Sequence, residues 1–336
     1  MKPVIFGIAG ECLSEAERAF FKECEPAGYI LFHRNCVDRV QVRALTDELR
    51  ELHGCDNLLI MVDQEGGRVA RMKPPVWPQF PPAAVFDSLY GVSPSSAMEA
   101  CRLNALAIAA TLRECGITVD AIPLLDVRQE GASDIMGDRT FGTEPMRVAA
   151  LGRAVLDGLK AGGVTGIVKH MPGHGRAVVD SHHELPVVTA DENALRIDIE
   201  PFMTLRDAPV GMTAHIIYTA WDADRPASLS PTIIDGIIRR RIGFDGLLMS
   251  DDLDMKALKG GIPALAAAVV EAGCDLALNC WAKMDDMIGI AEALPDIGEA
   301  AAARLDRALA ATGDVPASEP LPTLIARRDA LLGVMA

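Results

Sequence analysis

The chain has 336 residues, half of them hydrophobic, which is enough for one large core or two small ones. Its formal net charge is −15 and no Lys/Arg-rich tract offsets that charge, so nucleic-acid binding is not expected. No stretch approaches the roughly 20 uninterrupted apolar residues of a membrane span, and the N-terminal apolar run is too short for a signal peptide. The eight cysteines form no C-x-x-C pair, which predicts reduced thiols in a cytoplasmic protein.

Short aliphatic runs that end at polar residues recur along the chain and predict β-strands. The eight runs cover residues 4–9, 29–32, 58–62, 118–125, 166–168, 210–214, 246–249 and 276–278. They are apolar on both faces, which is typical of a parallel sheet covered by helices. Helical spacing between them predicts helices over 97–115, 146–161, 233–241 and 263–272, with glycines 162, 163 and 273 as helix stops.

This alternation predicts an α/β fold, a single-domain (β/α)8 TIM-type barrel over residues 1–336, with a helical C-terminal segment from about residue 283. The competing architecture is a doubly wound open sheet, but its dinucleotide-binding version is excluded because the first turn lacks G-x-G-x-x-G. The proline-rich stretch at 73–82 is interpreted as a rigid surface loop, not as a linker between domains.

Ionisable residues follow six of the predicted strands, at the end of a barrel where active sites lie. They stand at 33–35, 63–68, 126, 169–170, 215 and 250–252. Each one alone has a simple structural explanation, such as a helix cap or a scaffold ion pair. Helix capping does not readily explain all six strand ends together, so we expect a functional site there.

Four of the seven histidines lie between residues 169 and 183. His170 and His174 have the spacing of one helix face, but Pro172 and Gly173 between them disfavour a helix, and no H-E-x-x-H motif is present. A metal site is therefore disfavoured, which leaves acid–base chemistry or ligand binding. Asp180 precedes His182 by two residues and could orient its imidazole.

The segment KHMPGHGRAVVDSH (169–182) resembles the K-H-F-P-G-H-G-x4-D-S-H signature of family 3 glycoside hydrolases of the β-N-acetylglucosaminidase type. VDQEGGRVAR (62–71), MGDRTFG (136–142), the strand end at His215 and GFDGLLMSDDLDM (243–255) resemble the same family in the same order. Met171 replaces the usual Phe, and His183 follows the D-S-H triplet where the family varies. Neither departure removes an acid–base group.

The resemblance implies a role for each matching residue. Asp251 would be the nucleophile, and His182 paired with Asp180 the general acid/base. The residues that would bind the sugar are Asp63, Arg71, Arg139, Lys169, His170 and His215. A retaining glycosidase needs such a nucleophile and proton shuttle, and needs no metal or other cofactor. Strand parity does not choose between Asp251 and Asp252, because the strand before them is apolar on both faces; the resemblance favours Asp251.

The implied function is an exo-acting, retaining β-N-acetylglucosaminidase. The implied substrate is a cytoplasmic peptidoglycan fragment of cell-wall recycling, in which N-acetylglucosamine is linked to 1,6-anhydro-N-acetylmuramic acid with or without peptide. The enzyme is expected to be a cytoplasmic monomer without nucleic-acid or membrane partners. Two alternatives stay open: a phosphorylase that uses the same site, and a catalytically silent sugar-binding protein.

Overall fold

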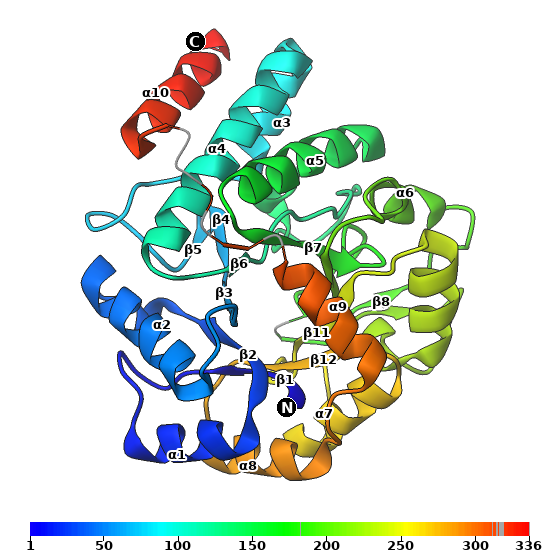
Figure 1. Ribbon diagram of the computed structural model, residues 1–336. Coiled ribbons are helices and arrows are strands. Elements are labelled where there is room, and N and C mark those ends of the chain that lie inside the picture. Colours follow the sequence, from blue (N-terminus) through cyan, green and yellow to red (C-terminus); the bar gives the residue numbers. More distant parts are fainter. Residues whose placement is uncertain (182, 311, 314, 316–318, 336) are drawn as a thin grey trace.

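The computed structural model describes residues 1–181, 183–310, 312–313, 315 and 319–335. Eight parallel strands close into a barrel in the order β1-β12-β11-β9-β7-β6-β3-β2 (Figure 1). Their bounds are β1 (Lys2–Gly7), β2 (Pro26–Leu31), β3 (Leu59–Val62), β6 (Val119–Asp120), β7 (Thr165–Met171), β9 (Val210–Thr213), β11 (Leu247–Asp252) and β12 (Leu276–Asn279). The predicted (β/α)8 barrel is confirmed, and each predicted run contributes one of these strands.

Helices surround the barrel, as a parallel sheet with apolar outer faces requires. They are α1 (Glu15–Cys24), α2 (Arg39–His53), α3 (Ala83–Val92), α4 (Pro94–Glu114), α5 (Pro145–Ala161), α6 (Arg196–Thr204), the π-helix η4 (Thr232–Ile242), α7 (Ile262–Glu271) and α8 (Met284–Ala293). The helix predicted over 233–241 is thus a π-helix. The predicted stops are confirmed, because α5 and α7 end just before Gly163 and Gly273, which both have positive φ.

Two further helices follow near the C-terminus, α9 (Glu299–Leu309) and α10 (Leu321–Leu332). Helix α9 lies across the barrel in Figure 1, and its Leu305 and Ala308 pack into the inner barrel core. Thr165 at the start of β7 donates a 2.8 Å hydrogen bond to the Ala308 carbonyl. Helix α9 therefore closes the amino-terminal end of the barrel. The treatment of 1–336 as one domain stays a prediction.

Short strands and turns lie in the loops that follow the barrel strands, at the carboxyl end of the barrel. They are β4 (Gln64–Gly66), β5 (Val69–Ala70), β8 (Val187–Val188), β10 (Ile217–Tyr218), and the 3-10 turns η1 (His33–Asn35), η2 (Gly137–Arg139) and η3 (Ala227–Leu229); η5 (Gly333–Met335) ends the described chain. The stretch 73–82 is not only a surface loop, because Trp77 and Phe80 within it are buried. Among the described residues, no helix is long and apolar enough to cross a membrane.

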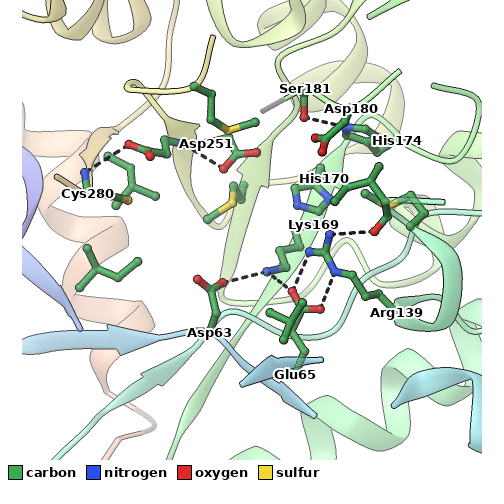
Figure 2. Close-up of a pocket in the computed structure, with 18 of the residues that line it drawn as sticks. Asp63, Glu65, Arg139, Lys169, His170, His174, Asp180, Ser181, Asp251 and Cys280 are labelled. Carbon is green, nitrogen blue, oxygen red and sulfur yellow. Dashed lines mark hydrogen bonds and ion pairs between the residues drawn. The ribbon is translucent and has the colours of Figure 1, made fainter. Parts of the chain in front are cut away.

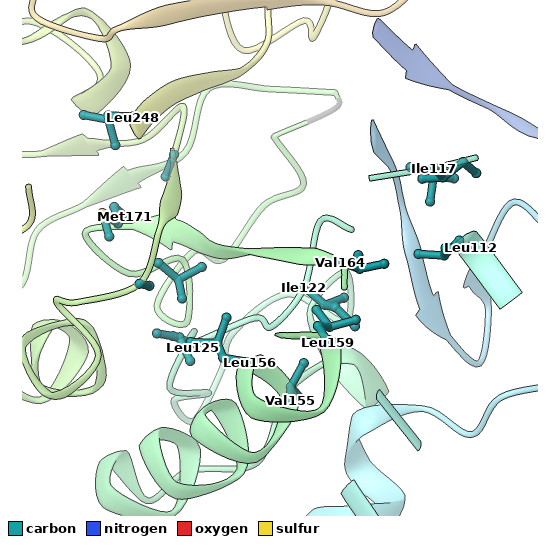
Figure 3. Packing of buried hydrophobic residues seen from close by; sticks show 14 of the residues in the cluster. Leu112, Ile117, Ile122, Leu125, Val155, Leu156, Leu159, Val164, Met171 and Leu248 are labelled. Atoms are coloured by element: carbon teal, nitrogen blue, oxygen red, sulfur yellow. The ribbon is translucent and has the colours of Figure 1, made fainter. Parts of the chain in front are cut away.

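Two hydrophobic layers hold the strands in place. Inward-facing residues such as Ile5, Met61 and Leu247 fill the barrel. Outward-facing residues pack against the helices, and Figure 3 shows this layer around β7 and α5, with Leu125, Leu156 and Leu159 among its members. The carboxyl ends of the strands are thereby held on a rigid frame.

Candidate active site

A cavity of about 440 Å³ lies at the carboxyl ends of the barrel strands. Its floor includes Ile30, Met212, Leu278 and Cys280, which all belong to the inner barrel core. Charged and histidine side chains form the walls above this floor (Figure 2). In (β/α)8 barrels the active site lies at this end, so the cavity is the candidate active site.

One wall holds a group of ion-paired side chains, Asp63, Glu65, Arg71, Arg139 and Lys169, here called the charged cluster. The Lys169 ammonium lies 3.1 Å from Asp63 and 2.9 Å from Glu65. Arg139 binds both carboxylate oxygens of Glu65, each at 2.8 Å. Arg71 donates to Asp63 at 2.8 Å. The predicted sugar-binding residues of this wall are therefore brought together, with Glu65 as an additional member.

Mutual attraction keeps the cluster ionised. Burial alone would raise the pKa of Glu65, but Lys169 and Arg139 outweigh it and lower this pKa to about 2. Burial also opposes ionisation of Asp63, yet Lys169 and Arg71 hold its pKa well below the usual range. The pKa of Lys169 is raised despite its burial, because both carboxylates face it. The wall is a fixed array of charged donors and acceptors.

The hairpin of β4 and β5 positions Arg71. The buried Gln64 side chain donates to the Met72 carbonyl at 2.9 Å and accepts hydrogen bonds from the amides of Arg71 and Met72 at 3.0 and 3.1 Å. Asp120, at the end of β6, accepts the Gln64 amide at 2.9 Å. One buried amide side chain thus ties the end of the hairpin back to its start.

Arg139 lies on a loop that a second arginine holds. Arg68 pairs with Asp138 at 2.9 Å and donates to the carbonyls of Asp134 and Ile135 at 2.9 and 2.6 Å. Because Arg68 follows the β4 strand, these contacts fix the Arg139 loop relative to the hairpin. Arg71 and Arg139, the two arginines of the charged cluster, are thereby positioned by the same hairpin.

The end of β7 places His170 against Asp126, a carboxylate with no exposure. Asp126 accepts hydrogen bonds from the His170 amide at 3.1 Å and the His174 amide at 2.6 Å, and its second oxygen lies 2.8 Å from Nδ1 of His170. Burial opposes ionisation of Asp126, but the two histidines lower its pKa. An ionised Asp126 makes Nδ1 of His170 the donor and fixes the orientation of that ring.

Glycines 173 and 175 let the loop after β7 pack closely against neighbouring segments. A Cβ on Gly175 would lie 1.9 Å from the Val127 carbonyl oxygen, and one on Gly173 would lie 2.9 Å from the Asp198 side chain. Tyr218 donates to the Gly173 carbonyl at 2.8 Å. The base of this loop is therefore closely packed against the rest of the protein.

The residue expected to be the acid/base, His182, lies outside the described residues. Its expected partner Asp180 lines the cavity, together with Ser181 and His183. His183 Nε2 lies 3.8 Å from the Asp180 carboxylate, and the His183 side chain is 75% exposed. The pairing of Asp180 with His182 stays a prediction.

Asp251 and Asp252, at the end of β11, both line the cavity. The Asp252 amide donates to the Asp251 carboxylate at 2.8 Å. The Asp252 carboxylate accepts the amides of Asp254 and Cys280, both at 3.2 Å. Burial, Asp254 and Asp251 raise the pKa of Asp252 to about 7. The Asp252 carboxylate is thus held by the backbone amides of Asp254 and Cys280.

His215 was grouped with the sugar-binding residues, and the structure places it differently. Its side chain is fully buried and is not part of the cavity lining. Nδ1 lies 2.7 Å from the Ser228 hydroxyl, and Nε2 lies 3.0 Å from the Asp252 carbonyl oxygen. Because both ring nitrogens have protein partners, His215 positions the end of β11.

The described residues contain no group of three or more His, Cys, Asp or Glu side chains placed to hold a metal ion. Several cavity residues had no predicted role: Glu65, His174, Ser181 and Cys280, with Asp126 directly behind the wall. Glu65 and Asp126 were noted at strand ends, and Glu65 also lies in the motif at 62–71, but neither signal indicated their partners. The contacts that give them a function join distant parts of the chain.

Comparison with known proteins agrees with this geometry. Residues 8–311 match the glycosyl hydrolase family 3 N-terminal domain. The chain is 38% identical over 283 residues to a beta-hexosaminidase of Bordetella avium (strain 197N), across 83% of this chain and 80% of the relative. It is 40% identical over 286 residues to a beta-hexosaminidase of Chromobacterium violaceum, across 83% and 78%. The crystal structure of NagZ from Neisseria gonorrhoeae in complex with N-trifluoroacetyl-D-glucosamine superposes with a TM-score of 0.87 at 31% identity, covering 100% of this chain and 98% of the other.

Proposed function

The chain belongs to glycosyl hydrolase family 3 and is a glycoside hydrolase of the β-N-acetylhexosaminidase class; from this premise we propose that it removes terminal, non-reducing N-acetylglucosamine with retention of configuration. One observation carries the proposal. Asp251 lines the same cavity as the charged cluster and as Asp180 of the loop after β7. A candidate nucleophile, a sugar-binding wall and the loop of the expected acid/base therefore surround one space.

The proposed reaction is a double displacement. Asp251 attacks the anomeric carbon and forms an ester bond while the glycosidic carbon–oxygen bond breaks. The leaving oxygen takes a proton from His182, whose orientation is assigned to Asp180. In the second half, His182 removes a proton from water, which attacks the anomeric carbon and releases Asp251. Two inversions give a product of retained β configuration.

We propose exo action from the resemblance of the segment 169–182 to the family signature. Ile30, Met212 and Leu278 at the floor of the cavity belong to a packed barrel core, so the sugar enters and leaves at the carboxyl end of the barrel. The charged cluster supplies both donors and acceptors for the hydroxyls and the acetamido group of the terminal sugar.

Charge favours water over phosphate as the second substrate. The described cations of the cavity wall are Arg71, Arg139 and Lys169, and each is paired with a carboxylate. The described cavity carboxylates are Asp63, Glu65, Asp180, Asp251 and Asp252. An incoming phosphate dianion would meet these carboxylates without an uncommitted cation among the described residues. We therefore propose hydrolysis over phosphorolysis.

The proposed natural substrate is a cytoplasmic peptidoglycan fragment in which N-acetylglucosamine is linked to 1,6-anhydro-N-acetylmuramic acid, and the proposed enzyme is a cytoplasmic monomer. Support for the sugar comes from the similar NagZ, which was crystallised with N-trifluoroacetyl-D-glucosamine. The assignment of the 1,6-anhydro-N-acetylmuramic acid part is supported by the resemblance of residues 169–182 to the family signature.

The test compares 4-nitrophenyl β-glycosides of N-acetylglucosamine and glucose, with and without inorganic phosphate. We expect kcat/KM to favour the acetamido sugar by about 10²-fold or more, because a site built to bond an amide leaves its own groups unpaired without it. The first product observed by NMR should be the free β-anomer at every phosphate concentration. Equal kcat/KM values, a sugar phosphate, or no turnover would contradict the proposal.

A further inference from the structure

The loop that carries Asp180 is fastened by a histidine at its own base. Nε2 of His174 lies 3.2 Å from the Ser181 hydroxyl, seven residues further along the chain (Figure 2). Both side chains line the cavity, and both are almost fully buried, with 2% and 3% exposure. Ser181 stands between Asp180 and His182 in the sequence. The bond therefore acts at the centre of the expected catalytic pair.

His174 is also held by its backbone and by a neighbouring ring. The His174 backbone amide donates to Asp126 at 2.6 Å, and the His174 ring packs edge-on against the His170 ring, with the ring centroids 5.4 Å apart. Nδ1 of His174 is buried and has no hydrogen-bond partner among the described residues. The hydrogen bond of the ring is therefore the one between Nε2 and the Ser181 hydroxyl. Burial and His170 lower the pKa of His174 to about 4, which leaves the ring neutral near pH 7.

We propose that His174 is a positioning residue for the proton-transfer step, which acts by holding Ser181, and with it the adjacent Asp180, beside the cavity. The same Asp126 carboxylate orders the sugar-facing His170 and the amide of His174. The geometry therefore couples the sugar-binding wall to the acid/base loop through Asp126, His174 and Ser181. This inference rests on the proposed function, because it assigns His174 to the step that His182 performs.

Two other roles for His174 predict different measurements. A scaffold residue affects folding, and its loss lowers kcat/KM equally on all substrates. A substrate ligand affects binding, so its loss raises KM on all substrates. A positioning residue for the acid acts mainly where the leaving group needs a proton, and it changes KM little.

The experiment measures kcat/KM on two N-acetylglucosaminides, one with the activated 2,4-dinitrophenyl leaving group and one with an alkyl leaving group. The variants are Ser181→Ala, His174→Leu and His174→Gln, with His182→Ala as reference and Ser88→Ala as control. Ser88 is the control serine because its hydroxyl donates to the Ala84 carbonyl at 2.9 Å on an exposed part of α3. Thermal unfolding is recorded for each variant.

Ser181→Ala should lower kcat/KM on the alkyl glycoside roughly 3- to 10-fold, the usual worth of one hydrogen bond, and leave the activated substrate almost unchanged. His174→Leu should lose more on the alkyl glycoside, and His174→Gln, which keeps a terminal amide near the Nε2 position, should recover part of the loss. Ser88→Ala should match the unmodified enzyme. Should His174→Leu fail to fold, Ser181→Ala decides the matter alone.

Equal losses on both substrates, a rise in KM alone, or no effect of Ser181→Ala would overturn the inference. These outcomes differ from failure of the proposed function. If His182→Ala itself shows no dependence on the leaving group, the assignment of the acid/base is wrong. If His182→Ala shows that dependence and the Ser181 and His174 variants do not, only the positioning role is wrong.

Discussion

At the scale of single residues, two pairs of consecutive residues depart from the alternation of a regular strand, because both members of each pair face the cavity. Lys169 and His170 both line the cavity at the end of β7, and Asp251 and Asp252 do so at the end of β11. Successive side chains of a regular strand point to opposite faces of the sheet. Register irregularities lie between Val168 and Met171 and between Met249 and Asp252. Irregular strand ends thus turn two consecutive side chains toward one space.

Packing shows which residues of β11 face inward. Leu247 and Met249 belong to the inner barrel core, and Leu248 belongs to the outer layer. The sequence could not show this, because all three residues are apolar and a strand buried on both faces carries no polarity difference. The register irregularity lies between Met249 and Asp252, so this alternation does not choose between Asp251 and Asp252, and the choice of Asp251 stays a prediction.

Glu65→Gln tests the charged cluster. Glu65 is 5% exposed and neutralises both Lys169 and Arg139. Removal of one partner from a buried ion pair costs about 3–5 kcal/mol, so unfolding by urea should show a loss of that order, and kcat/KM should fall at least about 10-fold. Glu48→Gln is the control, because Glu48 pairs with the half-exposed Arg18 and should change stability by less than about 1 kcal/mol. Similar losses in both variants would contradict the assigned role.

What could be read from the sequence at this scale depended on motifs and strand ends. The motifs placed Asp63, Arg139 and Lys169 in one site, and they meet there. Sequence reasoning gave no role to Glu65, and it grouped His215 with the sugar-binding residues. A strand-end position shows that a side chain is near the mouth. It does not show whether protein atoms already satisfy that side chain, as Ser228 and Asp252 satisfy His215.

At the scale of elements, hydrophobic runs located every barrel strand but not its length. The run 118–125 forms only the two-residue β6, followed by an isolated bridge between Leu124 and Lys169. Pro123 lies between the two and has no amide hydrogen for a regular ladder. Burial of Trp77 and Phe80 was also missed, because proline content indicates a rigid loop and not which of its side chains face the core.

Gly175→Ala tests the close packing at the base of the loop after β7. The added Cβ would meet Val127 backbone at 1.9 Å, so the loop must shift. We expect a loss of about 1–3 kcal/mol in unfolding free energy and lower kcat/KM, since the loop carries Asp180. Gly91→Ala is the control: its Cβ meets nothing within 4 Å, and it should stabilise α3 by about 0.5–1 kcal/mol. A neutral Gly175→Ala would show that the loop base tolerates movement.

At the scale of the whole molecule, the cavity makes stability depend on pH. The pKa of Asp252 is raised from 3.8 to about 7, chiefly by burial. The folded state therefore keeps a proton that the unfolded chain releases. Stability from this group is fully present below about pH 4 and is lost as pH rises through about 7.

Asp252→Asn isolates this effect. The variant cannot lose a proton, so its stability relative to the unmodified enzyme should improve as pH rises from 5 to 8, by at most about 1.4 kcal/mol per pH unit. Urea unfolding at several pH values measures the difference, in which groups that do not interact with Asp252 cancel. A constant difference, or one that shrinks with pH, would contradict the raised pKa.

The central claim is that Asp251 forms a covalent bond with the sugar, and one measurement tests it most directly. A slow 5-fluoro-N-acetylglucosaminyl substrate should trap the glycosyl-enzyme, and peptide digestion followed by mass spectrometry should find the label on Asp251. Asp251→Asn should take up no label, whereas Asp252→Asn should still be labelled. A label on Asp252 or another residue, or the absence of any adduct together with an α-configured first product, would contradict the account.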